Sequence, residues 1–276
     1  MKSILPILFL SCCLSSAWAG KVDTVNIFSN SMHKDIRCVV IKPDRYKKKK
    51  LQFPVVYLLH GFTGDYANWI RRVPELKDYA DEFQLIIVCP DGGFSSWYFD
   101  SPVDSTIRYE TYVSTELISY IDSHYRTIAD KAHRAITGLS MGGHGGLFLG
   151  FRHTDTFGAI GSMSGGLDIN SIRNSYDLSL RIGDTISHAT EWHDLSVINL
   201  AEKYMPAGQA IIIDCGTDDI FIDANRRTHQ QLLRRRIPHE YIERPGVHNW
   251  DYWRKSVRYQ FFFFRNFFGG QKLATQ

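Results

Sequence analysis

Short runs of apolar, mostly β-branched residues recur along the chain, and helix-like segments separate them. The segments at 53–61, 85–91 and 209–216 contain the runs VVYLL, LIIVC and AIIID. Because these runs lack a polar face, they predict strands that are buried on both sides. Such strands need helices on both faces of a mostly parallel sheet, so the sequence predicts an α/β fold.

The remaining predicted elements follow the same pattern after an antiparallel start. Residues 22–30 and 36–44 predict an antiparallel strand pair. Further strands are expected at 133–140, 157–165 and 239–246, and helices at 75–83, 109–125, from 141 onward, 223–235 and 250–268. No repeat or low-complexity linker interrupts residues 20–276, so we expect one domain. The polar, irregular segment 166–208 is expected to pass over the carboxyl edge of the sheet, where such folds bind ligands.

The first nineteen residues, MKSILPILFLSCCLSSAWA, have the features of an export signal. Lys2 precedes an apolar core, and the closing AWA fits the small-residue cleavage pattern. The apolar run is too short to span a membrane. We therefore expect a signal peptide over residues 1–19, cleavage near Ala19, and a secreted or periplasmic protein. Lipidation of a cysteine in this segment is a weaker alternative, because the residues before each cysteine fit it poorly.

Charge and cysteine content exclude some classes of function. The formal net charge of +3 is too small to indicate nucleic-acid binding. Cys38, Cys89 and Cys215 have no metal-like spacing, and each lies in or beside a predicted buried strand. Free, packed thiols are therefore favoured, and one disulfide among them stays an open alternative.

A serine stands between two glycines where a predicted strand passes into a predicted helix, in TGLSMGGHGG at residues 137–146. A turn this tight strains the backbone at Ser140, and side chains two residues before and after it would collide, which explains Gly138 and Gly142. The serine oxygen then stands at a helix amino terminus, where the helix dipole favours a developing anion. Ser140 is thus the candidate nucleophile.

A serine hydroxyl needs a base, and the base needs an acid that holds its reactive tautomer. Of the 11 histidines, His248 lies after the last predicted strand and before the final helix. Asp214, Asp218 and Asp219 end or follow the strand before that one. We favour Asp219, because Asp214 is still within the strand and Asp218 can cap the following helix.

An oxyanion formed at the serine needs hydrogen-bond donors. One expected donor is the backbone N–H of Met141, directly after the nucleophile. The other is expected from the loop HGFTGDYANW at residues 60–69, where Gly61 lets the N–H of Phe62 turn inward.

With these motifs the chain resembles the esterase D family of α/β-hydrolases, which includes S-formylglutathione hydrolases, feruloyl and acetyl esterases, and mycolyltransferases. The matching segments, in family order, are VVYLLHGFTGDYANW, CPDGGFSSWYFDSP, ETYVSTELISYID, TGLSMGGHGGLFLGFRH, DCGTDDIFIDANR and PGVHNWDYW. The family pattern D-x-G-x-x-D-x-F places the catalytic acid at the second loop aspartate, Asp219. The resemblance implies an α/β-hydrolase fold, with a mostly parallel sheet, an antiparallel first pair and helices on both faces. It also implies a catalytic triad and two oxyanion donors at Ser140, Asp219, His248, Phe62 and Met141.

Three tryptophans flank the predicted site: Trp69, Trp97 and Trp250. Aromatic rings beside the nucleophile can stack on a sugar or on an aromatic acyl group, so these residues are candidate substrate-binding residues. The alternative that they pack the edge of the sheet stays open.

The sequence thus predicts an exported serine carboxylic-ester hydrolase that acts through an acyl-enzyme on short-chain, acetyl or feruloyl esters of carbohydrate. Its partner would be a small ester or an acylated oligosaccharide, and this chemistry needs neither a metal nor an organic cofactor. One alternative is an acyltransferase that passes the acyl group to a sugar or lipid alcohol. Another is a catalytically dead carbohydrate-binding protein, which the intact set of candidate residues disfavours.

Overall fold

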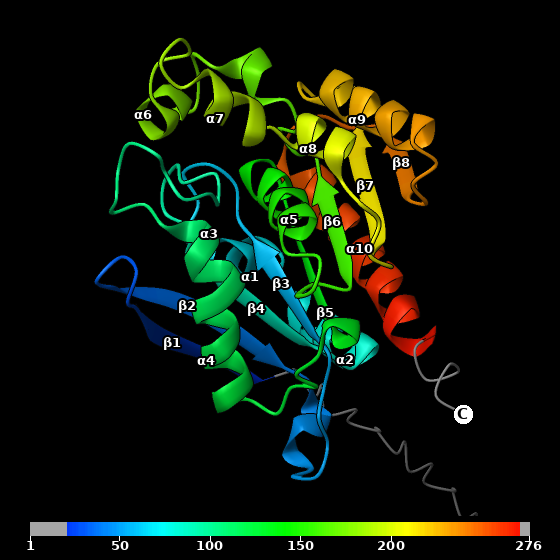
Figure 1. Cartoon of the computed structure of the whole chain (residues 1–276). Helices are drawn as coiled ribbons and strands as arrows, with labels where there is room; N and C mark the ends of the chain where they lie inside the picture. The colour runs from blue at the N-terminus through cyan, green and yellow to red at the C-terminus, as the bar shows by residue number, and fades with distance from the viewer. Residues whose placement is uncertain (1–20, 271–276) are drawn as a thin grey trace, which may run out of the picture.

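Eight strands form one sheet in the computed structural model, which describes residues 21–270 (Figure 1). The strands are β1 (Lys21–Ser29), β2 (Lys34–Lys42), β3 (Val55–Leu59), β4 (Ile86–Pro90), β5 (Arg134–Gly138), β6 (Ala159–Met163), β7 (Ala210–Gly216) and β8 (Glu240–Arg244). They lie in the order β1-β2-β4-β3-β5-β6-β7-β8. β2 runs antiparallel to both β1 and β4, and the remaining neighbours are parallel. The predicted fold class, the α/β-hydrolase fold, is confirmed.

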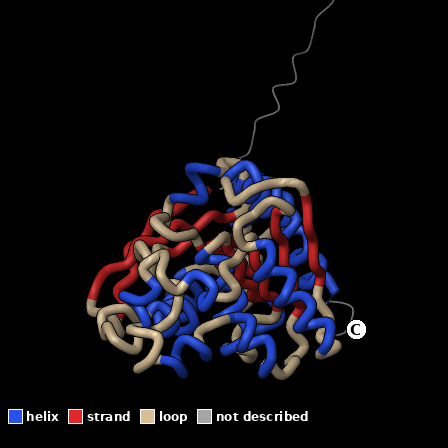
Figure 2. Tube along the Cα trace, turned by 90° about the horizontal axis from the view of Figure 1, so that it is seen from above, coloured by secondary structure: helices blue, strands red, loops and turns tan. Residues whose placement is uncertain are grey.

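Helices connect the strands and cover both faces of the sheet. They are α1 (Asn68–Arg72), α2 (Leu76–Phe83), α3 (Tyr109–Thr111), α4 (Leu117–His124), α5 (Met141–Arg152), α6 (Leu178–Ile182), α7 (Ala189–Asp194), α8 (Val197–Lys203), α9 (Ile222–Arg234) and α10 (Trp250–Gly270). Single turns of 3-10 helix lie at Asp44–Lys47, Lys131–His133 and Ile169–Ile172. The view from above shows helices and loops around the strands (Figure 2).

The apolar strand runs bury side chains on both faces, as their composition predicts. Val55 and Tyr57 of β3 belong to one core with α4, α5, α8 and α9. Val56 and Leu58 of the same strand belong to a second core with α1, α2 and α10. The two cores pack against opposite faces of the sheet. They thereby hold the loops at the carboxyl ends of its parallel strands in place.

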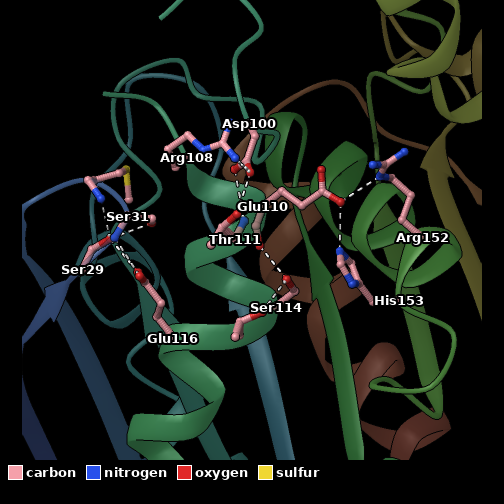
Figure 3. A network of polar contacts seen from close by, with 12 residues as sticks. Ser29, Ser31, Asp100, Arg108, Glu110, Thr111, Ser114, Glu116, Arg152 and His153 are labelled. Atoms are coloured by element: carbon pink, nitrogen blue, oxygen red, sulfur yellow. Dashed lines mark hydrogen bonds and ion pairs between the residues drawn. The ribbon is translucent and has the colours of Figure 1, made fainter. Parts of the chain in front are cut away.

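The predicted helix over 109–125 is continuous but contains one π-helical turn, Tyr112–Glu116, between α3 and α4. Ser114 donates its hydroxyl to the Glu110 carbonyl at 2.7 Å, a carbonyl that a regular α-helix would bond to a backbone N–H. Figure 3 shows Glu110 pointing toward Arg152 and His153 at the end of α5. Its carboxylate accepts from Arg152 Nε at 2.7 Å and His153 Nε2 at 2.9 Å, which ties this helix to α5.

The predicted excursion at 166–208 holds α6, α7 and α8, and in Figure 1 α6 and α7 lie beyond the carboxyl ends of the strands. Polar contacts fasten it to the rest of the chain. Trp97 Nε1 donates to the Tyr176 carbonyl at 3.1 Å, and His144 Nε2 lies 2.9 Å from the Leu195 carbonyl. Burial lowers the pKa of His144 to about 4, so the ring is neutral and donates from one nitrogen only.

The three predicted free thiols, Cys38, Cys89 and Cys215, are free and buried. Across residues 21–270, no helix is both long and apolar enough to cross a bilayer. The predicted signal peptide at 1–19 lies outside the described residues.

Candidate active site

Ser140 occupies a strained turn between β5 and α5. Its backbone angles are φ 55° and ψ −116°, a conformation that side chains rarely adopt. A Cβ added at Gly138 would lie 2.6 Å from the carbonyl oxygens of Gly142 and Leu59, and one added at Gly142 would lie 2.5 Å from that of Leu59. Both glycines are therefore required by close backbone approach, as the sequence predicts.

The structure brings the three predicted triad residues together from three loops at the carboxyl ends of β5, β7 and β8. His248 Nε2 lies 2.9 Å from Ser140 Oγ, and His248 Nδ1 lies 2.9 Å from each carboxylate oxygen of Asp219. Because an ionised carboxylate only accepts, Nδ1 carries the proton and Nε2 is left to accept from the serine hydroxyl. This is the arrangement that activates a serine for attack.

Asp219 is held rigidly in place. It is 3% exposed, and its Oδ1 also accepts the backbone N–H of Phe221 at 2.9 Å. The two alternative acids are engaged elsewhere. The exposed Asp218 accepts from the hydroxyl of Thr217 at 3.0 Å, and the buried Asp214 accepts at 2.6 Å from the hydroxyls of Tyr252 and Ser256 on α10.

The imidazole of His248 is also oriented by aromatic rings. Phe221 lies edge-on to it at 5.0 Å between ring centroids, and Trp253 does so at 4.8 Å. These contacts restrict rotation of the ring, so Nε2 stays directed at the serine oxygen.

The predicted oxyanion donors lie beside the serine. A Cβ added at Gly61 would lie 3.4 Å from the Ser140 Cβ, so the loop that carries Phe62 adjoins the nucleophile. Among the described residues, neither the Phe62 nor the Met141 backbone N–H donates to another group of the chain. Two unbonded donors beside a nucleophile suit a developing oxyanion.

Two residues, His60 and Tyr98, fix this loop, a role that the sequence analysis predicted for neither. The fully buried His60 accepts the Gly92 N–H at Nε2, 2.7 Å away, so its proton is on Nδ1, which donates to the Gly61 carbonyl at 2.8 Å. Tyr98 donates its hydroxyl to the His60 carbonyl at 3.0 Å. The sequence feature that could have indicated this role is the position of His60, directly after strand β3.

A cavity of about 380 Å³ opens over the serine. Its lining residues are Gly61, Phe62, Thr63, Gly64, Asn68, Arg72, Leu139, Ser140, Tyr176, His248, Trp250 and Trp253. Tyr176 comes from the excursion and meets Phe62 edge-on at 5.4 Å between ring centroids. The excursion therefore supplies one wall of the cavity through Tyr176. The mixed composition of 166–208 did not indicate this residue.

The tryptophan prediction is corrected for two of its three members. Trp69 and Trp97 are each 1% exposed, so neither ring has an open face for a substrate. Trp69 instead donates Nε1 to the Leu59 carbonyl at 2.9 Å and packs edge-on against Trp250. Trp250 is half-buried and lines the cavity, so its role in substrate binding stays a prediction.

A larger hollow of about 700 Å³ lies along the outer face of α10. None of the triad residues lines it, and its three arginines have carboxylate partners. Arg244 pairs with Asp214, Arg254 with Glu75 and Arg258 with Glu82. Within residues 21–270, no cluster of three or more histidine, cysteine or acidic side chains is placed to hold a metal ion. Ser140 and His248, by contrast, line the smaller cavity.

The chain is similar to known proteins in both sequence and structure. A family model described as putative esterase matches residues 29–261. An acetyl esterase of Caldicellulosiruptor saccharolyticus is 28% identical over 254 residues, 84% of this chain and 94% of that protein. A diacylglycerol acyltransferase/mycolyltransferase of Mycobacterium leprae is 31% identical over 172 residues, 59% of this chain and 49% of that protein. The solved structure of a ferulic acid esterase has a TM-score of 0.78 at 30% identity, covering 91% of this chain and 99% of that one.

Proposed function

Because the chain belongs to the putative esterase family and is a carboxylic ester hydrolase, we propose that Ser140, His248 and Asp219 are its catalytic triad. The observation that carries this proposal is the unbroken hydrogen-bonded path from the serine hydroxyl through the imidazole to the buried carboxylate, with contacts of 2.9 Å throughout. The strained backbone at Ser140 adds support, since strain of this kind persists where a function requires it.

In the proposed mechanism His248 Nε2 takes the proton of Ser140 as the serine oxygen attacks the ester carbonyl. Asp219 stabilises the imidazolium that forms, and the N–H groups of Phe62 and Met141 bind the oxyanion. His248 then gives its proton to the leaving alcohol, which leaves an acyl-enzyme. A water molecule, deprotonated by the same Nε2, attacks this ester and releases the acid and the free serine.

We propose short-chain, acetyl or feruloyl esters of carbohydrate as substrates. The acetyl esterase and ferulic acid esterase relatives support this class. Trp250 on the cavity wall supplies one half-buried aromatic ring for a sugar or an aromatic acyl group. We also propose that residues 20–276 form one domain and that the protein is exported after cleavage near Ala19, on the strength of the leader-like sequence of residues 1–19.

The acyltransferase relative supports a second candidate on the same triad, transfer of the acyl group to a sugar or lipid alcohol. In that reaction the alcohol replaces water at the acyl-enzyme. Product analysis with an added alcohol acceptor separates the two, because a transferase forms the new ester faster than it releases free acid.

The test compares the mature protein with Ser140→Ala on p-nitrophenyl acetate, methyl ferulate and acetylated xylo-oligosaccharides. We expect the variant to lose on the order of 10⁶ in kcat with its circular dichroism spectrum unchanged. Ser123→Ala, at an exposed serine on α4, is the matched control and should retain full activity. Substantial turnover by a folded Ser140→Ala protein would refute the assignment. A preference for the feruloyl or sugar esters would define the substrate class.

A further inference from the structure

Helix α1 presents one polar edge to the cavity beside the nucleophile. Asn68 and Arg72 are four residues apart, so they lie on the same side of the helix, and both line the cavity. The neighbouring Arg71 turns away and pairs with Asp65 at 2.6 Å. Asp65 also caps this region by accepting the Ala67 N–H at 2.8 Å, so α1 is fixed at its start.

Arg72 is the one permanently charged side chain among the described residues that line this cavity. No acidic side chain of residues 21–270 lies within ion-pair distance of it. Its guanidinium carbon lies 5.9 Å from the centroid of the Trp250 ring. Arg71 and Arg254, by contrast, both have carboxylate partners. A cation without a counter-ion at the mouth of a reactive cavity raises the local concentration of anionic ligands.

Contacts between rings show which part of an ester would lie near Arg72. His248 contacts Trp253 at 4.8 Å, Trp253 contacts Trp250 at 5.5 Å, and the guanidinium of Arg72 lies over Trp250. Because these ring contacts connect Arg72 to His248, we infer that the cation lies on the histidine side of the serine. In the mechanism above, the histidine protonates the leaving alcohol, so the alcohol portion of the ester lies on this side.

The ring between Arg72 and His248 is itself held in place. Trp250 packs edge-on against Trp69, 5.2 Å away, and the indole of Trp69 is anchored on the Leu59 carbonyl. A half-buried, supported ring beside an arginine offers an apolar surface and an ionic contact in one subsite.

We propose that Arg72, with Asn68 and Trp250, forms a subsite for a carboxylate in the alcohol portion of the substrate. The substrate class is an ester of a carboxylate-bearing alcohol, such as an acylated uronic acid or hydroxy acid. The ring or chain of that alcohol lies against Trp250, its carboxylate accepts hydrogen bonds from the guanidinium, and Asn68 supplies a further polar contact. This inference rests on the proposed function, since it assigns the leaving-group side from the role of His248.

The experiment uses two acetate esters with similar phenol leaving groups, the anionic 4-acetoxybenzoate and the neutral 4-acetoxybenzamide. Arg72→Gln should lower kcat/KM for the anionic ester by roughly five- to tenfold, the effect of removing one partly solvated, charge-assisted hydrogen bond. The neutral ester should change by less than about twofold, and most of the loss should be in KM. Added salt should shrink the anionic preference of the wild-type protein, because the exposed guanidinium is screened.

Arg71→Gln is the matched control, because it removes the neighbouring positive charge from a side chain that points away from the cavity. It should leave the ratio between the two esters unchanged. Equal losses on both esters in Arg72→Gln, or the same ratio change in Arg71→Gln, would overturn the subsite. A preference seen only with p-nitrophenyl hemisuccinate, whose carboxylate is on the acyl portion, would overturn the assignment to the alcohol side. Failure of the proposed function is distinguishable, since it would appear as Ser140-independent hydrolysis of the neutral ester.

Discussion

Replacing Gly142 with alanine tests how closely the nucleophile turn and the oxyanion loop are packed. An added Cβ would lie 2.5 Å from the Leu59 carbonyl oxygen and 2.6 Å from that of His60. Both contacts are with backbone, so no side-chain rotation relieves them. An ordinary van der Waals contact begins at 3.4 Å, and 3.4 minus 2.5 leaves 0.9 Å that the end of β3 or the start of α5 must move.

This displacement should reduce both stability and activity. Overpacking of this kind costs roughly 1–3 kcal/mol, which lowers Tm by roughly 2–12 °C in a domain of this size. His60 leads directly into Gly61 and Phe62, so the shift also moves one proposed oxyanion donor relative to Ser140. A misplacement near 1 Å can reduce the rate by about a hundredfold. We therefore expect kcat/KM of Gly142→Ala on p-nitrophenyl acetate to fall by about that factor, with Tm measured by circular dichroism.

Two further glycines serve as controls. Gly269→Ala near the end of α10 makes the same chemical change with no atom within 4 Å, so it should leave Tm and kcat/KM unchanged or raise Tm slightly. The Cβ added in Gly143→Ala would lie 2.8 Å from Gly165 Cα and from Ser162 Oγ, and its three nearest neighbours include no atom of the oxyanion loop. It should lower Tm with a smaller loss of activity than Gly142→Ala. A folded Gly142→Ala protein with wild-type kcat/KM would refute the coupling between the turn and the loop.

Two other substitutions test the acidic side chains. Asp219→Asn should lower kcat by about 10³–10⁴ in steady-state assays. The new amide can donate to His248 Nδ1 and so favours the tautomer that carries its proton on Nε2, which cannot accept the serine proton. A loss below about tenfold would contradict the proposed role. Burial alone would raise the pKa of Glu110, but its contacts with His153 and Arg152 outweigh that effect and hold the pKa below its usual range. Its folded pKa thus lies below its unfolded one, so the wild-type protein gains stability from Glu110 above about pH 4.3 and loses it as the pH falls through the folded pKa. Thermal unfolding from pH 7 to pH 3 should show a steeper loss for wild type than for Glu110→Gln, and parallel curves would contradict this.

The sheet was predictable because its signal is local and strong. Strand β3 buries alternate residues in two different cores, so its sequence must be apolar throughout, and that run is visible without any knowledge of partners. The elbow was predictable for a similar reason, since Gly138 and Gly142 are each required by a backbone approach of about 2.6 Å. The signals for His248 and Asp219 were weaker, and their positions relative to the last two strands selected them.

Other features depend on contacts that the sequence does not display. Trp69 and Trp97 flank the site in the chain, but each indole donates to a carbonyl of a different segment, Leu59 or Tyr176, and is buried there. The helices α6, α7 and α8 span five to seven residues each, too short for a helical period to be visible in a polar segment. The cation at Arg72 was missed because nothing in the sequence distinguishes Arg72 from Arg71. The two differ only in the side of α1 that each side chain occupies: Arg72 lines the cavity and Arg71 pairs with Asp65.

The buried acid that the sequence left as an alternative, Asp214, has a structural position that explains how distant loops keep a fixed geometry. It lies in β7, five residues before Asp219, and is fully buried. Its carboxylate accepts from Tyr252 and Ser256 on α10 and from Arg244 at the end of β8. The loop that carries His248, the proposed base, connects β8 to α10. The Asp214 carboxylate therefore bonds to both ends of this loop. It also lies in β7, the strand that leads to the proposed catalytic acid, Asp219. Removal of the ionic partner, Arg244, would cost about 3–5 kcal/mol, because it leaves a buried carboxylate without a counter-ion. Removal of either hydroxyl would cost about 1–3 kcal/mol. The 2.9 Å contacts between Asp219 and His248 therefore depend on packing in the sheet as well as on the loops themselves.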